Sequence, residues 1–141
     1  MVKCYVFPIA LYGMEGWTLT QRLEAKITAF EMWIYRRLLR ISWRDRISNE
    51  EIIARMDTKR TLLHSIKKRK LEYFGHVMRN QKYNLLQLIL QGRIEGRRAP
   101  GRRRTSWMAN LREWFGKSNV GLFRAADEKV QIAMMIANLQ T

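Results

Sequence analysis

Cysteine and proline are almost absent from this sequence, and acidic residues are few. The single Cys4 excludes an internal disulfide bond and a zinc site built on cysteines. Two prolines and eight glycines leave long stretches of good helix formers uninterrupted. No apolar run approaches the roughly 20 residues of a membrane span, and the short apolar start lacks the basic segment and cleavage site of a signal peptide. We therefore expect an intracellular protein, nuclear or cytoplasmic.

Positive charge is what the sequence has in excess. Of its 141 residues, 27 are basic and 12 are acidic, which gives a net charge of +15, while 47% are hydrophobic and can form a core. Residues 36–104 alone carry 20 basic and 6 acidic side chains, or +14 of that total. A localised charge of this size favours a polyanionic partner. Nucleic acid is the commonest such partner, and an anionic membrane surface comes second.

Apolar periodicity and capping signals predict helices along most of the chain. Thr20 is placed to cap a long helix, and Ser48 a short one that ends near residues 56–57. We expect further helices at 58–79, at 83–91, from 105 or 106 to 115, and from 118 or 119 to 139. The apolar face predicted for the long helix consists of Leu23, Ile27, Phe30, Ile34, Leu38 and Ile41.

An arginine-rich loop at residues 92–104 is the strongest functional signal. Six arginines lie within the 12 residues 93–104, interspersed with glycine and proline, so the segment is unlike a packed element. Arginine can donate two hydrogen bonds to one phosphate, which favours phosphate binding over a solvated linker. Trp107 follows the loop and could stack on an unpaired base, but it shares a helical face with Leu111 and Trp114, which favours a core role. The candidate residues of the loop are Arg97, Arg98, Arg102, Arg103 and Arg104.

Two further basic clusters lie on the predicted helices. Each alone is typical of a solvated helix face, but three clusters in one small domain favour shared phosphate binding. Four consecutive charges point all round a helix, so we expect at least one of the second cluster to lie against the fold. Nothing in the sequence indicates base-specific recognition. The first cluster is Arg36, Arg37, Arg40, Arg44 and Arg46, and the second is Lys67, Lys68, Arg69 and Lys70.

Catalytic signals are weak. Capping and the helix dipole account for Glu50 and Glu51, and His64 and His76 are about 18 Å apart along one predicted helix, too far to share a metal. We therefore expect no catalytic residues, no metal, no cofactor and no small-molecule substrate.

Four blocks in a fixed order resemble the C-terminal part of non-LTR (LINE-type) retrotransposon endonuclease–reverse transcriptases. They are residues 11–20, with the Tyr-Gly-Met-Glu-Gly-Trp run, residues 29–43, residues 67–79 and the arginine loop before Trp107. The resemblance covers most of residues 5–116 and implies a helical thumb and a basic extension that contact template RNA, primer DNA or their hybrid. The family's Tyr-x-Asp-Asp polymerase motif, its fingers and its endonuclease domain are absent from this sequence. Residues 127–135 depart from the family, because they are apolar and lack its tryptophan.

The expected architecture is all-α, with five to six helices. We expect a thumb-like unit at 1–81, which includes a palm-exit strand or turn, and a basic extension at 82–141. The function expected is RNA or DNA binding without sequence specificity and without catalysis, with the palm domain of a reverse transcriptase as a further partner. Three alternatives stay open: reverse transcriptase or endonuclease activity, a basic membrane-surface or protein-interaction module, and a chain that needs the palm in order to fold.

Overall fold

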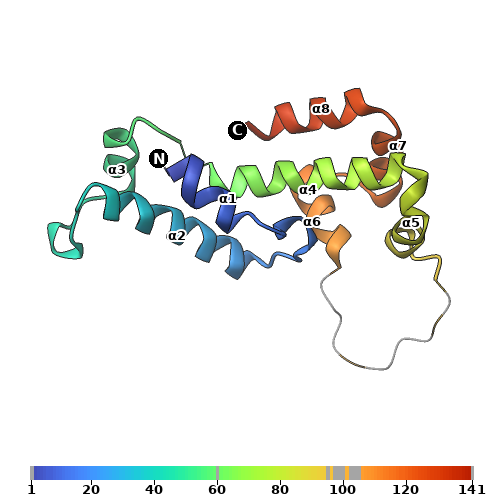
Figure 1. Ribbon diagram of the computed structural model, residues 1–141, viewed down its shortest axis with the longest axis horizontal. Coiled ribbons are helices and arrows are strands. Elements are labelled where there is room, and N and C mark those ends of the chain that lie inside the picture. The colour runs from blue at the N-terminus through green and yellow to red at the C-terminus, as the bar shows by residue number, and fades with distance from the viewer. Residues whose placement is uncertain (1, 60, 95, 97–100, 102–105, 141) are drawn as a thin grey trace. The chain divides into compact units, whose positions relative to one another are not determined.

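The computed structural model describes residues 2–59, 61–94, 96, 101 and 106–140, and these residues form helices and the turns between them. Within them there is no β-strand and there are eight α-helices (Figure 1). The all-α class is confirmed, but five to six helices was too few, and the strand considered at the start is a π-helical turn, Val2–Val6. The helices are α1 Phe7–Ala10, α2 Gln21–Leu38, α3 Asn49–Arg55, α4 Leu62–Arg79, α5 Asn84–Gln91, α6 Trp107–Phe115, α7 Asn119–Asp127 and α8 Lys129–Ala137. Short 3-10 turns occupy Met14–Gly16, Trp43–Asp45, Gln81–Tyr83 and Asn138–Gln140.

The chain forms two compact units that divide within α4. The first comprises residues 1–14 and 19–66, and the second comprises residues 15–18 and 67–141. The functional boundary expected at 81 and 82 rests on the family resemblance and stays a prediction.

Helix α2 of the first unit begins where the sequence predicts but buries a different face. The hydroxyl of Thr20 accepts a hydrogen bond from the Leu23 amide at 3.3 Å, as an N-cap should. Phe30 and Leu38 were expected inside and are exposed, so that part of the predicted apolar face is wrong. The buried residues are Ile27, Glu31, Met32, Ile34 and Tyr35.

The physical reason for the different face is Glu31, which lies at the centre of the buried stripe. Its Oε1 accepts hydrogen bonds from the amides of Thr61 at 2.8 Å and Leu62 at 3.1 Å, and from the Tyr35 hydroxyl at 2.9 Å. The first amides of a helix have no partner within it, and a negative charge there is favoured by the helix dipole. Glu31 therefore caps α4 from another helix, and α4 begins at Leu62 instead of the predicted residue 58.

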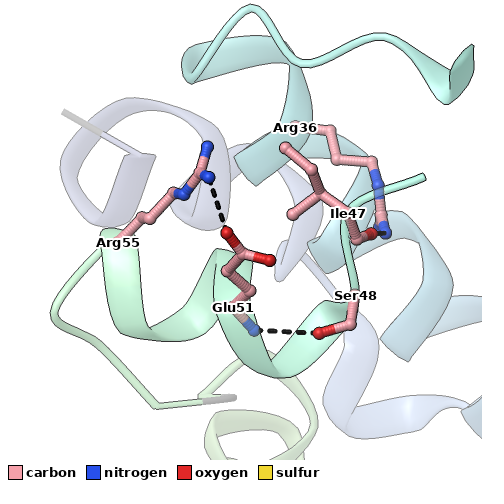
Figure 2. A network of polar contacts seen from close by, with 5 residues as sticks. All are labelled: Arg36, Ile47, Ser48, Glu51 and Arg55. Atoms are coloured by element: carbon pink, nitrogen blue, oxygen red, sulfur yellow. Dashed lines mark hydrogen bonds and ion pairs between the residues drawn. The ribbon is translucent and has the colours of Figure 1, made fainter. Parts of the chain in front are cut away.

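Helix α3 begins at the predicted cap. The Ser48 hydroxyl accepts a hydrogen bond from the Glu51 amide at 3.2 Å, while the Glu51 carboxylate lies 2.6 Å from the Arg55 guanidinium (Figure 2). The serine cap and the acidic first turn are both favourable at a helix N-terminus.

The second unit packs α6, α7 and α8 against α4. Leu71 and Phe74 of α4 share a core with Leu111 of α6, Leu122 of α7 and Ile132 of α8. A Cβ atom on Gly75 would come within 3.3 Å of Ile132 and 2.8 Å of the Arg79 guanidinium, so a residue without a side chain allows α8 to approach α4.

The C-terminal segment departs from the single helix expected from 118 or 119 to 139. Glu128 adopts an extended conformation (φ −105°, ψ 113°) and ends α7, and its carbonyl accepts from the Gln131 and Ile132 amides at the start of α8. Ser118, Gly92 and Gly116 cap helix ends as the sequence predicts.

The Tyr35–Glu31 contact makes a prediction about alkaline pH. Burial, the hydrogen bond to Glu31 and the charge of Glu31 together raise the pKa of Tyr35 from 10.0 to about 12. The unfolded chain releases this proton first, so the contribution of Tyr35 to the free energy of unfolding is complete below pH 10.0 and is lost as the pH rises towards about 12. We expect the difference in that free energy between the wild type and Tyr35→Phe to shrink over this range, as measured by urea unfolding. The matched control is Tyr12→Phe, whose ring is exposed, and a constant difference for Tyr35→Phe would contradict the prediction.

Candidate nucleic-acid interface

Arg36 of the first basic cluster makes hydrogen bonds within the fold. Its guanidinium donates to the Asn49 Oδ1 atom at 2.8 Å. It also donates to the Ile47 carbonyl at 3.0 Å (Figure 2). These bonds fix the segment that leads into α3 on α2, and the side chain is only partly accessible. Arg36 therefore has less freedom to meet a phosphate than its neighbours.

The other arginines of that cluster are exposed, and two of them lie over tryptophan rings. The guanidinium carbon of Arg37 is 5.4 Å from the ring centre of Trp33, and that of Arg44 is 5.7 Å from Trp43. Arg40 follows α2 in the left-handed conformation (φ 54°), and the Ile41 amide bonds back to the Arg36 carbonyl at 3.0 Å to close the helix end. Exposed cations beside aromatic rings can contact both phosphates and unpaired bases.

Three of the four cations in the second cluster reach the surface of α4. Lys67 is partly buried and lies 5.2 Å from the ring centre of Trp114. Lys68 and Arg69 are exposed and make long ion pairs, 3.9 Å to Glu72 and 3.8 Å to Glu15. Exposed pairs of this kind are weak, about 0–1 kcal/mol, so a phosphate can compete for these cations.

Lys70 is the cation of that cluster that lies against the fold, as the sequence predicts for at least one. It is 0% exposed, so its ammonium group cannot meet a polyanion, and Lys70 does not belong to the proposed interface. Its Nζ atom donates to the Asn110 Oδ1 atom at 2.8 Å and to the Trp17 carbonyl at 2.7 Å. The same atom lies 4.6 Å from the ring centre of Trp107 and 5.3 Å from that of Trp114, so two aromatic faces stabilise the buried charge.

Trp107 takes the core role that its helical face favours. Its indole Nε1 donates to the Glu15 carbonyl at 2.8 Å, and its ring packs against Tyr73 and Phe74. The indole thus contributes to the core of the second unit and to the surroundings of Lys70.

The predicted residues of the arginine loop lie outside the described part of the chain. Arg93, at the start of that loop, is described and exposed. The candidates that lie outside are Arg97, Arg98, Arg102, Arg103 and Arg104.

Sequence reasoning missed the exposed aromatic rings of the first unit. Phe30 and Trp33 are 41% and 53% exposed, and Trp43 is 83% exposed. A helical wheel could have found the first two, because Phe30 and Trp33 share a face with Lys26 and Arg37 rather than with the buried Ile27.

Within the described residues, no helix is both long and apolar enough to span a membrane. Nor do the histidine, cysteine and acidic side chains described gather into a group of three that could hold a metal ion.

The chain is similar to a transposon-derived protein of Caenorhabditis elegans. The two are 32% identical over 112 residues, which cover 77% of this chain and 40% of that protein. The chain thus spans less than half the length of this relative. No protein-family model and no solved structure matches the chain. The similarity supports an origin in a transposable element.

The buried Lys70 generates a prediction about stability. Methionine has a similar length and can keep the contacts with Trp107 and Trp114, but it removes the donor shared by the Trp17 carbonyl and the buried Asn110 oxygen. We expect Lys70→Met to lower the free energy of unfolding by about 1–3 kcal/mol, measured by urea unfolding. The control is Lys68→Met on the same helix, where the side chain is exposed and the change should be within about 0.5 kcal/mol. Equal stability of Lys70→Met and the wild type would contradict this role.

Proposed function

We propose that this chain binds RNA or DNA through its phosphate backbone, without sequence specificity and without catalysis of its own. The observation that carries the proposal is the net charge of residues 36–104, which is +14. The exposed cations of this segment include Arg37, Arg40, Arg44, Lys68 and Arg69. Phosphates bind such cations with release of counterions, which supplies most of the affinity of non-specific complexes.

We further propose that the chain corresponds to the thumb and basic extension of a non-LTR retrotransposon reverse transcriptase. The four sequence blocks and the similarity to a transposon-derived protein support this origin. In that setting the exposed cations of each unit contact template or primer, while a separate palm domain carries out the chemistry.

Binding should depend steeply on salt. With about six phosphates engaged on a duplex, the logarithm of the binding constant should fall with the logarithm of salt concentration at a slope near −5. Fluorescence anisotropy of a labelled duplex, titrated between about 50 and 200 mM salt, measures this slope. The double variant Arg37→Gln/Arg44→Gln should make the slope shallower by about two.

The matched control for that variant is Lys129→Gln, because Lys129 is an exposed cation of α8 outside residues 36–104. This substitution should leave the slope unchanged.

Vesicles of anionic lipid, offered at physiological salt, test the membrane alternative. A slope near zero with nucleic acid, or tighter binding to vesicles than to RNA and DNA, would refute the proposed function.

The enzymatic alternative has a direct test. We expect no extension of a labelled primer when the purified chain is given a primed RNA template, deoxynucleotides and magnesium, because the Tyr-x-Asp-Asp motif of the resembled family is absent. A full-length reverse transcriptase serves as the positive control. A product that depends on this chain would show that it has catalytic activity.

A further inference from the structure

One exposed face of α2 combines cations and aromatic rings in a regular pattern. Successive positions are four, four, three and four residues apart, which places all five side chains within an arc of about 80° on the helix surface. The face extends about 22 Å along the helix axis. We call it the α2 stripe, and it consists of the exposed residues Arg22, Lys26, Phe30, Trp33 and Arg37.

The two rings of the α2 stripe stack on one another in the middle of it, and we call this pair the platform. Phe30 and Trp33 are stacked, with ring centres 6.2 Å apart and planes inclined by only 14°. Arg37 continues the platform, with its guanidinium carbon 5.4 Å from the Trp33 ring centre. An aromatic ring or a guanidinium plane can stack on the flat face of a nucleobase, whatever the base.

The charges around the platform are all positive. Arg22 and Lys26 lie towards the N-terminus of α2 and Arg37 towards its C-terminus, so cations flank the rings on both sides. The acidic residues of α2 lie elsewhere, because Glu31 is buried and Glu24 falls on the opposite side of the helix. A polyanion with flat apolar groups matches this arrangement of rings between cations better than an apolar protein surface does.

We propose that the α2 stripe binds a single strand of nucleic acid, with an unpaired base stacked against the Phe30–Trp33 pair and neighbouring phosphates on Arg22, Lys26 and Arg37. The proposal deepens the proposed function and rests on it. A single strand is required because the faces of paired bases in a duplex are covered by their neighbours in the stack. The stripe thus gives the chain a preference for single-stranded segments that phosphate contacts alone would not produce.

The test compares one strand with its duplex, using the full chain and a fluorescently labelled oligodeoxythymidine, free or paired with oligodeoxyadenosine. We expect Trp33→Ala to weaken binding to the single strand about ten-fold and to change duplex binding less than about two-fold. The slope of binding against salt should stay the same, because no cation is removed. Trp33→Phe keeps a ring and should restore most of the affinity.

Two further variants separate stacking from charge. Tyr12→Ala removes an aromatic ring that is 88% exposed and lies in the same unit but outside the stripe, and it should bind as the wild type does. Lys26→Gln should make the salt slope on the single strand shallower by about 0.7 and leave the difference between wild type and Trp33→Ala intact. Circular dichroism melts of every variant establish that each one is folded.

The outcomes distinguish this inference from the function it rests on. If Trp33→Ala is folded and binds the single strand as tightly as the wild type, the stripe is not a stacking site, although steep salt dependence would still support phosphate binding. If Trp33→Ala keeps its affinity for the single strand but loses binding to the palm domain of a reverse transcriptase, the stripe is a protein-binding surface and the inference is overturned. If the wild type binds neither strand nor duplex, the proposed function fails and the inference fails with it.

Discussion

The first compact unit depends on one buried carboxylate. Glu31 is 1% exposed, and one of its oxygens accepts hydrogen bonds from Tyr35 in its own helix and from the first two amide groups at the start of α4. A carboxylate removed from water is costly unless it is fully hydrogen-bonded, and the partnerless amides of a helix start are donors well suited to it. The hydrogen bonds to the Thr61 and Leu62 amides therefore satisfy both the buried carboxylate and the partnerless amides. They link residues about 30 positions apart in the chain. Because α4 belongs to both units, this cap fixes the start of the helix that they share.

The second unit contains the complementary case, a buried cation. Lys70 places its ammonium group between a carbonyl, an amide oxygen and two tryptophan rings. Oxygen acceptors and ring faces together replace the water that burial removes. Lys70 and Arg36 also show that net charge overstates the surface available to a polyanion, because part of the positive charge is used inside the fold. The exposed arginines and lysines that remain are the ones on which the proposed binding would depend.

Local sequence signals were sufficient to predict many of the helix starts and ends. Long-range contacts account for the helix bounds that the sequence did not predict. The helix starts at Thr20 and Ser48 and the ends at Gly92 and Gly116 follow from residues within one turn, so the sequence predicts them. The start of α4 depends on Glu31, which the sequence places in another helix, and no local pattern reveals that bond. The break at Glu128 has no glycine or proline to mark it, and it lets α8 pack on Gly75. For the candidate site, the sequence located the basic clusters but could not tell the buried Lys70 from its exposed neighbours.

The error in the face of α2 connects its stability to its surface. Apolar periodicity alone selects Phe30 for the interior and assigns a charged residue such as Glu31 to solvent. The structure reverses this choice, because the Thr61 and Leu62 amides and the Tyr35 hydroxyl replace the water that the Glu31 carboxylate loses on burial. Turning the helix to bury Glu31 brings Phe30 and Trp33 outside, next to Lys26 and Arg37. The cap of α4 and the exposed aromatic platform are thus two sides of the same helix, and a rotation that hid the rings would remove the carboxylate from the amides it caps.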